Sequence, residues 1–168
     1  MAAISATSHT VRCIKSRRIR MIINGKSLLD MAPIKDMVGD KMKQNGVSYG
    51  LGEAGYDIRI KQEIWLAPNN RFKLASAIEE FDMPTNLVGV VHDKSTWARR
   101  GLSVFNTVIE PGFKGGLTLE LVYHGVEGIH IKAGSGIAQV LFHETAERAA
   151  YDGKYQHQST DPVPARDS

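Results

Sequence analysis

Short segments of alternating apolar and polar residues follow one another from residue 56 to residue 142. Side chains alternate across a strand, so such segments predict half-buried strands. Turn signals separate most of them, among them Pro68-Asn69-Asn70 and Glu110-Pro111-Gly112. Many short strands with regular breaks predict an all-β sandwich or barrel-like domain. The predicted strand segments are Tyr56–Ile60, Glu63–Leu66, Phe72–Ala75, Leu87–Val91, Ser103–Ile109, Gly116–Tyr123, Gly128–Ile131 and Gly136–Phe142.

The chain before residue 56 and the end of the chain depart from this pattern. Ile22–Leu29 predicts a short strand or turn that leads into a helix near Ser27–Met31. Several glycines between residues 46 and 55 predict loops. The last stretch, Asp152–Ser168, is polar and contains two prolines. We therefore divide the chain into a basic tail at 1–20 that we expect to be disordered, a β domain at 21–150, and a flexible C-terminal tail at 151–168.

Composition narrows the class of protein. The chain has 168 residues, of which 42% are hydrophobic and 23% charged, as is typical of a single globular domain. No apolar run approaches the ~20 residues that a membrane-spanning helix needs, so we expect no membrane partner. The low cysteine content suits a reducing cytoplasm, where we expect the protein to be located. Cys13 is the single cysteine, which excludes an internal disulfide and a zinc site built from paired cysteines.

The net charge of +3 is unevenly distributed, because cations crowd the N-terminus and no acidic residue precedes Asp30. We favour the interpretation that residues 1–20 are a leader ahead of the folded domain. A targeting segment and a disordered arm that contacts nucleic acid are the alternatives. Nucleic acid is thus not an expected partner of the domain itself. The cations are Arg12, Lys15, Arg17, Arg18 and Arg20.

Glu120 is the strongest single candidate for chemistry. It lies in Leu117–Tyr123, where Leu117, Leu119, Leu121 and Tyr123 share one face of the predicted strand and Thr118, Glu120 and Val122 share the other. The second face is half apolar, so the carboxyl group is expected to be partly desolvated. A carboxyl group in such surroundings suits general acid and base catalysis near neutral pH. On this pattern alone, a solvent-facing strand glutamate is the alternative.

Two further segments carry polar side chains that suit a nucleotide. Asp93–Gly101 follows a predicted strand and holds hydroxyls and cations that could bind an anion at a turn or short helix. Lys154–Gln158 combines a cation, an aromatic ring and amides. Histidines are scattered, and no His-x-Glu precedes a Cys-x-x-Cys, so the zinc-deaminase signature is absent.

Taken in order, these segments resemble the trimeric dUTPase and dCTP deaminase family over roughly Gly50–Gln158. The strand around Glu120 matches the family pattern I-T-L-E-L, and Ile109–Gly115 matches I-D-P-G-[FW]-x-G. The remaining matching segments are Tyr56-Asp57-Ile58-Arg59, Pro84–Gly89, Lys94–Gly101, Gly136–Gln139 and Lys154–Gln158.

The resemblance implies an all-β, dUTPase-like distorted β-barrel or β-clip with one or two short helices, assembled as a homotrimer with active sites between subunits. It implies dCTP or another pyrimidine deoxynucleoside triphosphate as substrate, with Mg²⁺ bound to the triphosphate and no zinc. Glu120 would activate water for attack on C4 of the base. Ser95 would fix that water or the amino group, and Arg99 would balance charge or hold phosphates. The implied substrate-binding residues are Lys94, Thr96, Thr107, Glu110, Gln139, Lys154, Tyr155 and Gln158.

Two positions separate the activities within this family. Stand-alone dUTPases lack a glutamate at the place of Glu120 and use an aspartate at the place of Glu110. Leu102–Ile109 has eight residues, about two fewer than the deaminase pattern, in which a Thr-Ala pair lies near the pyrimidine; Thr107 is the candidate for that threonine. We therefore expect a dCTP deaminase that gives dUTP, or dUMP if it is bifunctional. A dUTPase and a non-catalytic nucleotide-binding regulator are the alternatives.

Overall fold

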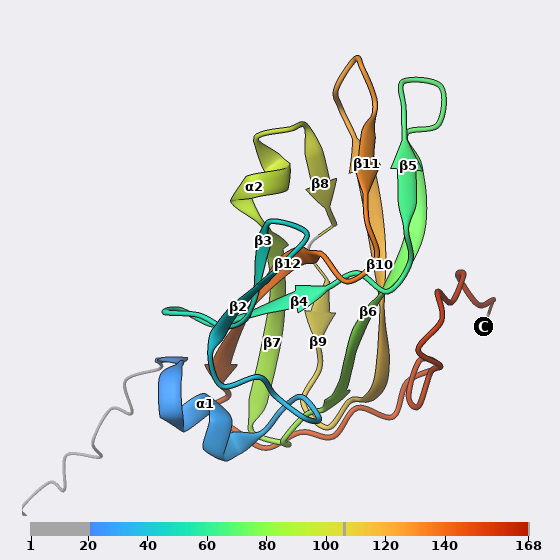
Figure 1. Ribbon diagram of the computed structural model, residues 1–168. Helices are drawn as coiled ribbons and strands as arrows, with labels where there is room; N and C mark the ends of the chain where they lie inside the picture. Colours follow the sequence, from blue (N-terminus) through green and yellow to red (C-terminus); the bar gives the residue numbers. More distant parts are fainter. Residues whose placement is uncertain (1–20, 106, 168) are drawn as a thin grey trace, which may run out of the picture.

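The computed structural model describes residues 21–105 and 107–167. The basic tail predicted at residues 1–20 lies outside the described residues. The described part contains two short helices, α1 (Gly25–Met31) and α2 (Ser95–Ala98), among twelve strands (Figure 1). The predicted helix near Ser27–Met31 is therefore confirmed as α1. Its C-cap residue, Ala32, lies in the left-handed region at φ 45°.

Every strand pairing in the described part is antiparallel. The large sheet has the order β2-β3-β4-β12-β7-β9, with β1 paired to β12. Its strands are β1 (Ile22–Ile23), β2 (Lys41–Gln44), β3 (Val47–Leu51), β4 (Tyr56–Arg59), β7 (Leu87–Asp93), β9 (Val108–Ile109) and β12 (Gly136–Glu144).

Two smaller sheets complete the domain. One has the order β6-β10-β8, and the other pairs β11 with β5 in a ribbon that projects from the body of the domain (Figure 1). Their strands are β5 (Ile64–Leu66), β6 (Phe72–Asp82), β8 (Leu102–Val104), β10 (Lys114–Tyr123) and β11 (Ile129–Ile131). This arrangement confirms the predicted all-β class.

One hydrophobic core joins the sheets. Leu119 and Leu121 of β10 are fully buried, as are Val140 and Phe142 of β12, and all four belong to the same buried cluster. Alternation in the sequence explains this, because each strand directs every second side chain inward. Complete burial of an aliphatic or aromatic side chain contributes roughly 1.5–3 kcal/mol. The core therefore fixes which face of β10 is left for polar side chains.

Three predicted segments differ from the structure. β6 extends well past the predicted Ala75, because it pairs with β10 as far as Asp82, and the acidic Glu79 in this extension is buried against Arg59. The segment 103–109 was expected as one strand, but β8 pairs with β10 and β9 pairs with β7. The loops expected between residues 46 and 55 include β3, which forms a hairpin with β2 through Asn45 and Gly46, both at positive φ.

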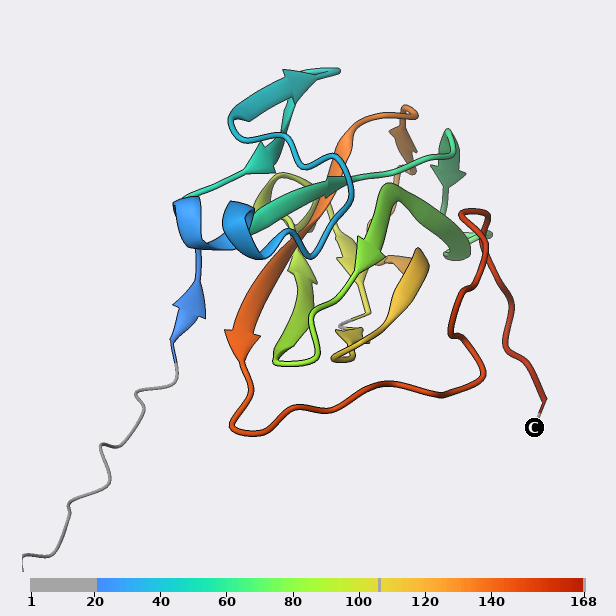
Figure 2. The same ribbon diagram turned by 90° about the horizontal axis from the view of Figure 1, so that it is seen from below.

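The C-terminal segment returns along the edge of the β6-β10-β8 sheet (Figure 2). The main-chain N–H of His157 donates to the carbonyl of Lys114, and the N–H of Gly116 donates to the carbonyl of Gln158. Further along, Ser76 donates its hydroxyl to the main-chain oxygen of Thr160 at 2.7 Å. The segment thus lies against β10 and β6; its predicted flexibility stays a prediction.

Candidate active site

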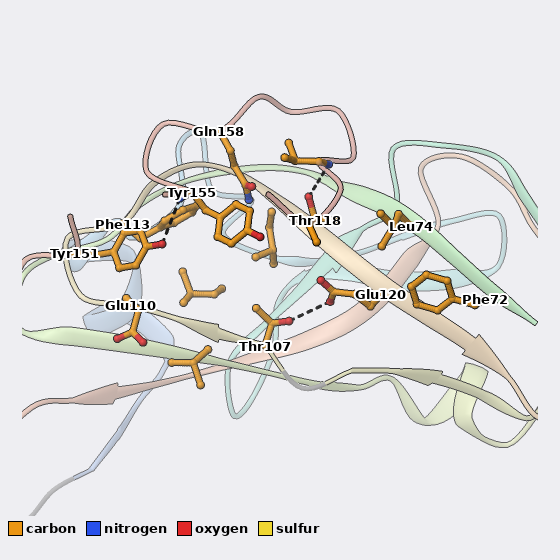
Figure 3. A pocket seen from close by; sticks show the side chains of 15 residues that line it. Phe72, Leu74, Thr107, Glu110, Phe113, Thr118, Glu120, Tyr151, Tyr155 and Gln158 are labelled. Atoms are coloured by element: carbon orange, nitrogen blue, oxygen red, sulfur yellow. Dashed lines mark hydrogen bonds between the residues drawn. The ribbon is translucent and has the colours of Figure 1, made fainter. Parts of the chain in front are cut away.

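A cavity of about 540 Å³ lies between β6, β9, β10 and the C-terminal segment (Figure 3). Its walls are mostly apolar, with a few polar side chains that point inward, as is typical of small-molecule sites. The apolar lining comes from Phe72, Leu74, Val108, Ile109, Phe113, Leu117, Val163 and Ala165, and the polar or aromatic-hydroxyl lining from Thr107, Glu110, Thr118, Glu120, Tyr151, Tyr155 and Gln158.

Glu120 reaches this cavity because of its register on β10. Leu119 and Leu121, its neighbours, are fully buried in the core, so the side chain of Glu120 lies on the opposite face. There it stands opposite Leu74 of β6 and is partly buried. The hydroxyl Oγ1 of Thr107 donates a hydrogen bond to Oε2 of Glu120 at 3.2 Å. A carboxylate is thereby held in an apolar wall with one oxygen engaged.

A β-bulge changes the pattern predicted for β10. The pairing with β6 shifts between Gly116 and Thr118, and a bulge re-aims the side chains around it. Leu117 was expected to share only the core face with Leu119, but its side chain also lines the cavity. Thr118 lies beside Glu120 on the cavity side and accepts the N–H of Val163 at 3.0 Å.

Glu110 lies at another wall of the same cavity, where it begins a turn. The N–H of Phe113 donates to the carbonyl of Glu110 at 3.1 Å. Gly112 in the turn has φ 76°, which favours glycine, and a Cβ there would make a tight contact at 3.0 Å from Cα of Ala150. The Glu110 side chain is exposed and brings a second carboxyl group to the cavity.

The C-terminal segment supplies Tyr155 and Gln158. Nε2 of Gln158 donates to the carbonyl of Gly116 at 2.7 Å. A Cβ at Gly116 would lie 2.4 Å from the carbonyl oxygen of Ser159, and one at Gly115 would lie 2.8 Å from that of Gln158. These two glycines therefore let the segment approach the strand that carries Glu120.

α2 is held to the large sheet by two buried contacts. Lys94 forms an ion pair with Asp57 in which both side chains are buried, and Nε1 of Trp97 donates to the carbonyl of Gly136 at 2.6 Å. The Trp97 side chain is buried and belongs to the hydrophobic core. Ser95 and Arg99, on the same helix and its C-terminal end, are exposed.

The family model described as dCTP deaminase-like matches residues 55–145. The chain belongs to this family. The "dCTP deaminase" of Campylobacter curvus is 34% identical over 168 aligned positions, which cover 80% of this chain and 90% of that protein. The "dCTP deaminase" of Campylobacter concisus is 36% identical over 151 positions, covering 70% of this chain and 81% of that protein.

Solved structures show the same fold. The dUTPase of EIAV matches with a TM-score of 0.52 at 19% identity, over 81% of this chain and 98% of that one. A variant of the dUTPase from phage phi11 of S. aureus, which coordinates a structural Mg(II) ion, matches with a TM-score of 0.50 at 15% identity, over 73% and 97%. This member of the dCTP deaminase-like family thus has the dUTPase fold.

The structure brings together part of the predicted site. Thr107, Glu110, Glu120, Tyr155 and Gln158 line one cavity. The other predicted residues do not line it within this chain, although Lys154 lies close by in sequence, where it donates to the carbonyl of Arg166 at 2.6 Å. The remaining members of that group are Lys94, Ser95, Thr96, Arg99 and Gln139.

Sequence reasoning missed most of the apolar wall and the role of the paired glycines. Phe72 and Leu74 were assigned to a strand but not to a site, and Thr118 was noted only as a neighbour of Glu120. The alternation of Phe72 and Leu74 along β6, facing the Glu120 side of β10, was the available signal. Val163 and Ala165 lie in a polar, proline-containing segment that carries no periodic pattern.

Among the described residues, no three His, Cys, Asp or Glu side chains gather where they could hold a metal ion. Neither of the helices in the described part is long and apolar enough to cross a membrane.

Proposed function

We propose that this protein is a dCTP deaminase, which hydrolyses the 4-amino group of dCTP to give dUTP and ammonia. The observation that carries the proposal is Glu120, a carboxyl group set into the wall of an apolar cavity and hydrogen-bonded by Thr107. Membership of the dCTP deaminase-like family supports the substrate class, since relatives at 34–36% identity bear that name.

The chemistry asks for a group that accepts and returns a proton. In the proposed reaction Glu120 takes a proton from water while the water oxygen forms a bond to C4 of the base. The C4–N bond then breaks and the amino group leaves as ammonia. Of the two hydrogens of the water, one ends on the ring nitrogen and one on ammonia, so Glu120 returns to its ionised form.

Apolar residues surround Glu120, where the proposed proton transfer takes place. Leu74 and Phe72 flank Glu120 on the β6 side, and Leu117 and Val163 close other parts of the cavity. Exclusion of bulk water strengthens electrostatic interactions inside a site. Tyr155 and Gln158 are placed to contact the nucleotide from the C-terminal segment, and we assign them to substrate binding.

We further propose that the protein works as a homotrimer in which α2 of one copy completes the cavity of another. Ser95 and Arg99 are exposed and do not line the cavity of their own chain. A triphosphate needs cationic partners, and the described residues that line this cavity include no lysine or arginine. Exposed apolar side chains at its rim, Phe72 and Val108, suit a covered surface. Lys94 is engaged by Asp57, so we assign it to holding α2 in place.

A magnesium ion would accompany the triphosphate. Glu110 offers carboxylate oxygens at the cavity wall, which is the ligand type that Mg²⁺ prefers. When bound, the ion would neutralise phosphate charge, and this chain would contribute Glu110 beside the phosphates' own oxygens. The structural Mg(II) of the phage phi11 dUTPase is consistent with such a preference in this fold.

The second candidate function is a dUTPase, or cleavage of the triphosphate in addition to deamination. The specific observation in its favour is that Glu110 lines the same cavity as Glu120. Glutamate is one methylene longer than the aspartate that dUTPases have at this place, which weakens the hypothesis that the protein is a dUTPase alone.

The deciding experiment incubates purified protein with dCTP and, separately, with dUTP, both with Mg²⁺, and resolves the nucleotides by ion-exchange chromatography. We expect dCTP to become dUTP with release of ammonia; dUMP in place of dUTP would make the enzyme bifunctional. Hydrolysis of dUTP with dCTP unchanged would replace the proposal with a dUTPase. Binding of either nucleotide without turnover would favour the non-catalytic regulator.

A further inference from the structure

Thr107 has two acceptors within reach of one hydroxyl group. Its Oγ1 lies 3.2 Å from Oε2 of Glu120 and 3.4 Å from the main-chain oxygen of Phe105. A hydroxyl group has one hydrogen to donate and two lone pairs with which to accept. It can therefore donate to either acceptor in turn, but not fully to both.

Main-chain hydrogen bonds fix these groups relative to one another. The N–H of Phe105 donates to the carbonyl of Glu120 at 3.0 Å, which ties Phe105 to β10. The carbonyl of Thr107 accepts the N–H of Val91 at 3.0 Å, which ties Thr107 to β7. Because Phe105 and Thr107 are both anchored to strands through their main chain, the Thr107 hydroxyl stays beside the Glu120 carboxyl group without relying on side-chain packing alone.

We infer that Thr107 is a positioning residue that holds Glu120 in place in both of its protonation states. While Glu120 is ionised, Thr107 donates to Oε2, as the structure shows. When Glu120 takes or returns a proton on Oε1, Oε2 still accepts from Thr107. When the proton lies on Oε2, its O–H donates to Oγ1 of Thr107, and the threonine hydrogen turns to the carbonyl of Phe105. Thr107 keeps its own hydrogen throughout, so no bond to it forms or breaks.

This role goes beyond the substrate contact that the sequence suggested for Thr107, and it rests on the proposed deamination. The two roles differ in what they change. A hydroxyl that contacts the base would affect KM and substrate affinity, whereas one that orients the acid and base group affects kcat. Thr118, on this face of β10, accepts the N–H of Val163, whereas the side chain that donates to the carboxyl group of Glu120 is Thr107, which precedes β9.

The test compares Thr107→Val, which removes the hydroxyl at similar volume, with Thr107→Ser, which retains it. Thr145→Val is the matched control, because its hydroxyl donates to the main-chain oxygen of Glu147 away from the cavity. For Thr107→Val we expect kcat for dCTP deamination to fall about 10- to 100-fold while KM stays within about twofold. Thr107→Ser should recover most of the rate, and Thr145→Val should behave as wild type.

The outcomes separate this inference from the proposed function. Wild-type protein that releases ammonia, together with a Thr107→Val variant of unchanged kcat, would overturn the role of Thr107 and leave the deaminase intact. A rise in KM at unchanged kcat would overturn it in favour of a base contact. A failure of Thr107→Ser to recover the rate would do so as well. Absence of ammonia release from wild type would refute the deaminase and, with it, this role.

Discussion

At the scale of single residues, Glu120 carries the largest share of the proposed chemistry. Glu120→Gln keeps the shape of the side chain and a possible hydrogen bond from Thr107, but it removes the basic oxygen. We expect kcat for deamination to fall by at least about 100-fold while dCTP affinity by calorimetry stays within about threefold. Glu127→Gln, at an exposed loop position, is the control. Deamination at the wild-type rate in Glu120→Gln would remove Glu120 from the mechanism.

Glu79 makes a prediction about pH. It is buried in β6 and accepts hydrogen bonds from the N–H and Nε of Arg59 at 2.8 and 2.9 Å. Burial raises the pKa of Glu79 above its ordinary value of 4.5, although the bonds from Arg59 lower it in part. The folded state therefore binds the proton more tightly than the unfolded state, and Glu79 costs stability as the pH rises from 4.5 through the raised pKa.

The measurement is the free energy of unfolding in urea for wild type and Glu79→Gln across this range, at one protein concentration. The difference between the two should move in favour of the variant as the pH rises through the window, by about 1.4 kcal/mol per unit of pKa shift at most. The difference in unfolding free energy should be constant at pH values below and above this window. Glu127→Gln should show a flat difference, and a flat difference for Glu79→Gln would contradict the assignment.

Residue-scale chemistry was only partly predictable from sequence. The alternation around Glu120 identified both its strand and its face, because those depend on immediate neighbours. The buried partner of Lys94 is Asp57, which is 37 positions away in sequence, and the hydrogen bond from Thr107, just before β9, reaches Glu120 on β10. Such contacts depend on how the sheets pair, which a local pattern does not encode.

At the scale of elements, the approach of the C-terminal segment to β10 depends on two glycines. Gly116→Ala would place a Cβ 2.4 Å from the carbonyl oxygen of Ser159, so the segment must shift away from the cavity. We expect KM for dCTP to rise several-fold, since Tyr155 and Gln158 move with the segment. Thermal unfolding of the domain should change little. Gly39→Ala is the control, because its Cβ would make an ordinary contact at 3.6 Å. Unchanged KM in Gly116→Ala would mean that the segment does not contribute to binding.

The strands predicted from sequence alternation differ from those of the structure mainly at their boundaries. Alternation predicted the body of β10 and of β12. It failed at residues 103–109, because β8 and β9 belong to different sheets while apolar residues continue on both sides of the change, at Val104 and Phe105 and again at Val108 and Ile109. It also failed at β2 and β3, since every residue of β2 is exposed and no apolar periodicity marks the strand. An edge strand of this kind is recognised by its partner, not by its own sequence.

At the scale of the whole molecule, the predicted site residues fall into two groups, one in the cavity and one on α2. The cavity gathers Glu120, Glu110 and the C-terminal residues, while Ser95 and Arg99 lie exposed on an element that is anchored by Trp97 and Lys94. Rigid anchoring of an exposed polar helix suits a group that must reach a fixed point outside its own subunit. In a closed ring of three copies, each cavity would receive α2 from one neighbour.

This arrangement predicts complementation between two inactive variants. Glu120→Gln removes the acid and base group from a cavity, and Arg99→Ala removes a cation that would enter the neighbouring cavity, so each variant alone should be nearly inactive. Co-expression at equal amounts gives mixed trimers, and in each of them about one third of the sites (one of the three) combine an intact Glu120 with an intact Arg99. We therefore expect about a third of the wild-type kcat per trimer from the mixed trimers, isolated by successive purification on two different affinity tags. Mixed trimers as inactive as either parent would place both residues in the same subunit's site, and an active Arg99→Ala homotrimer would remove α2 from the reaction.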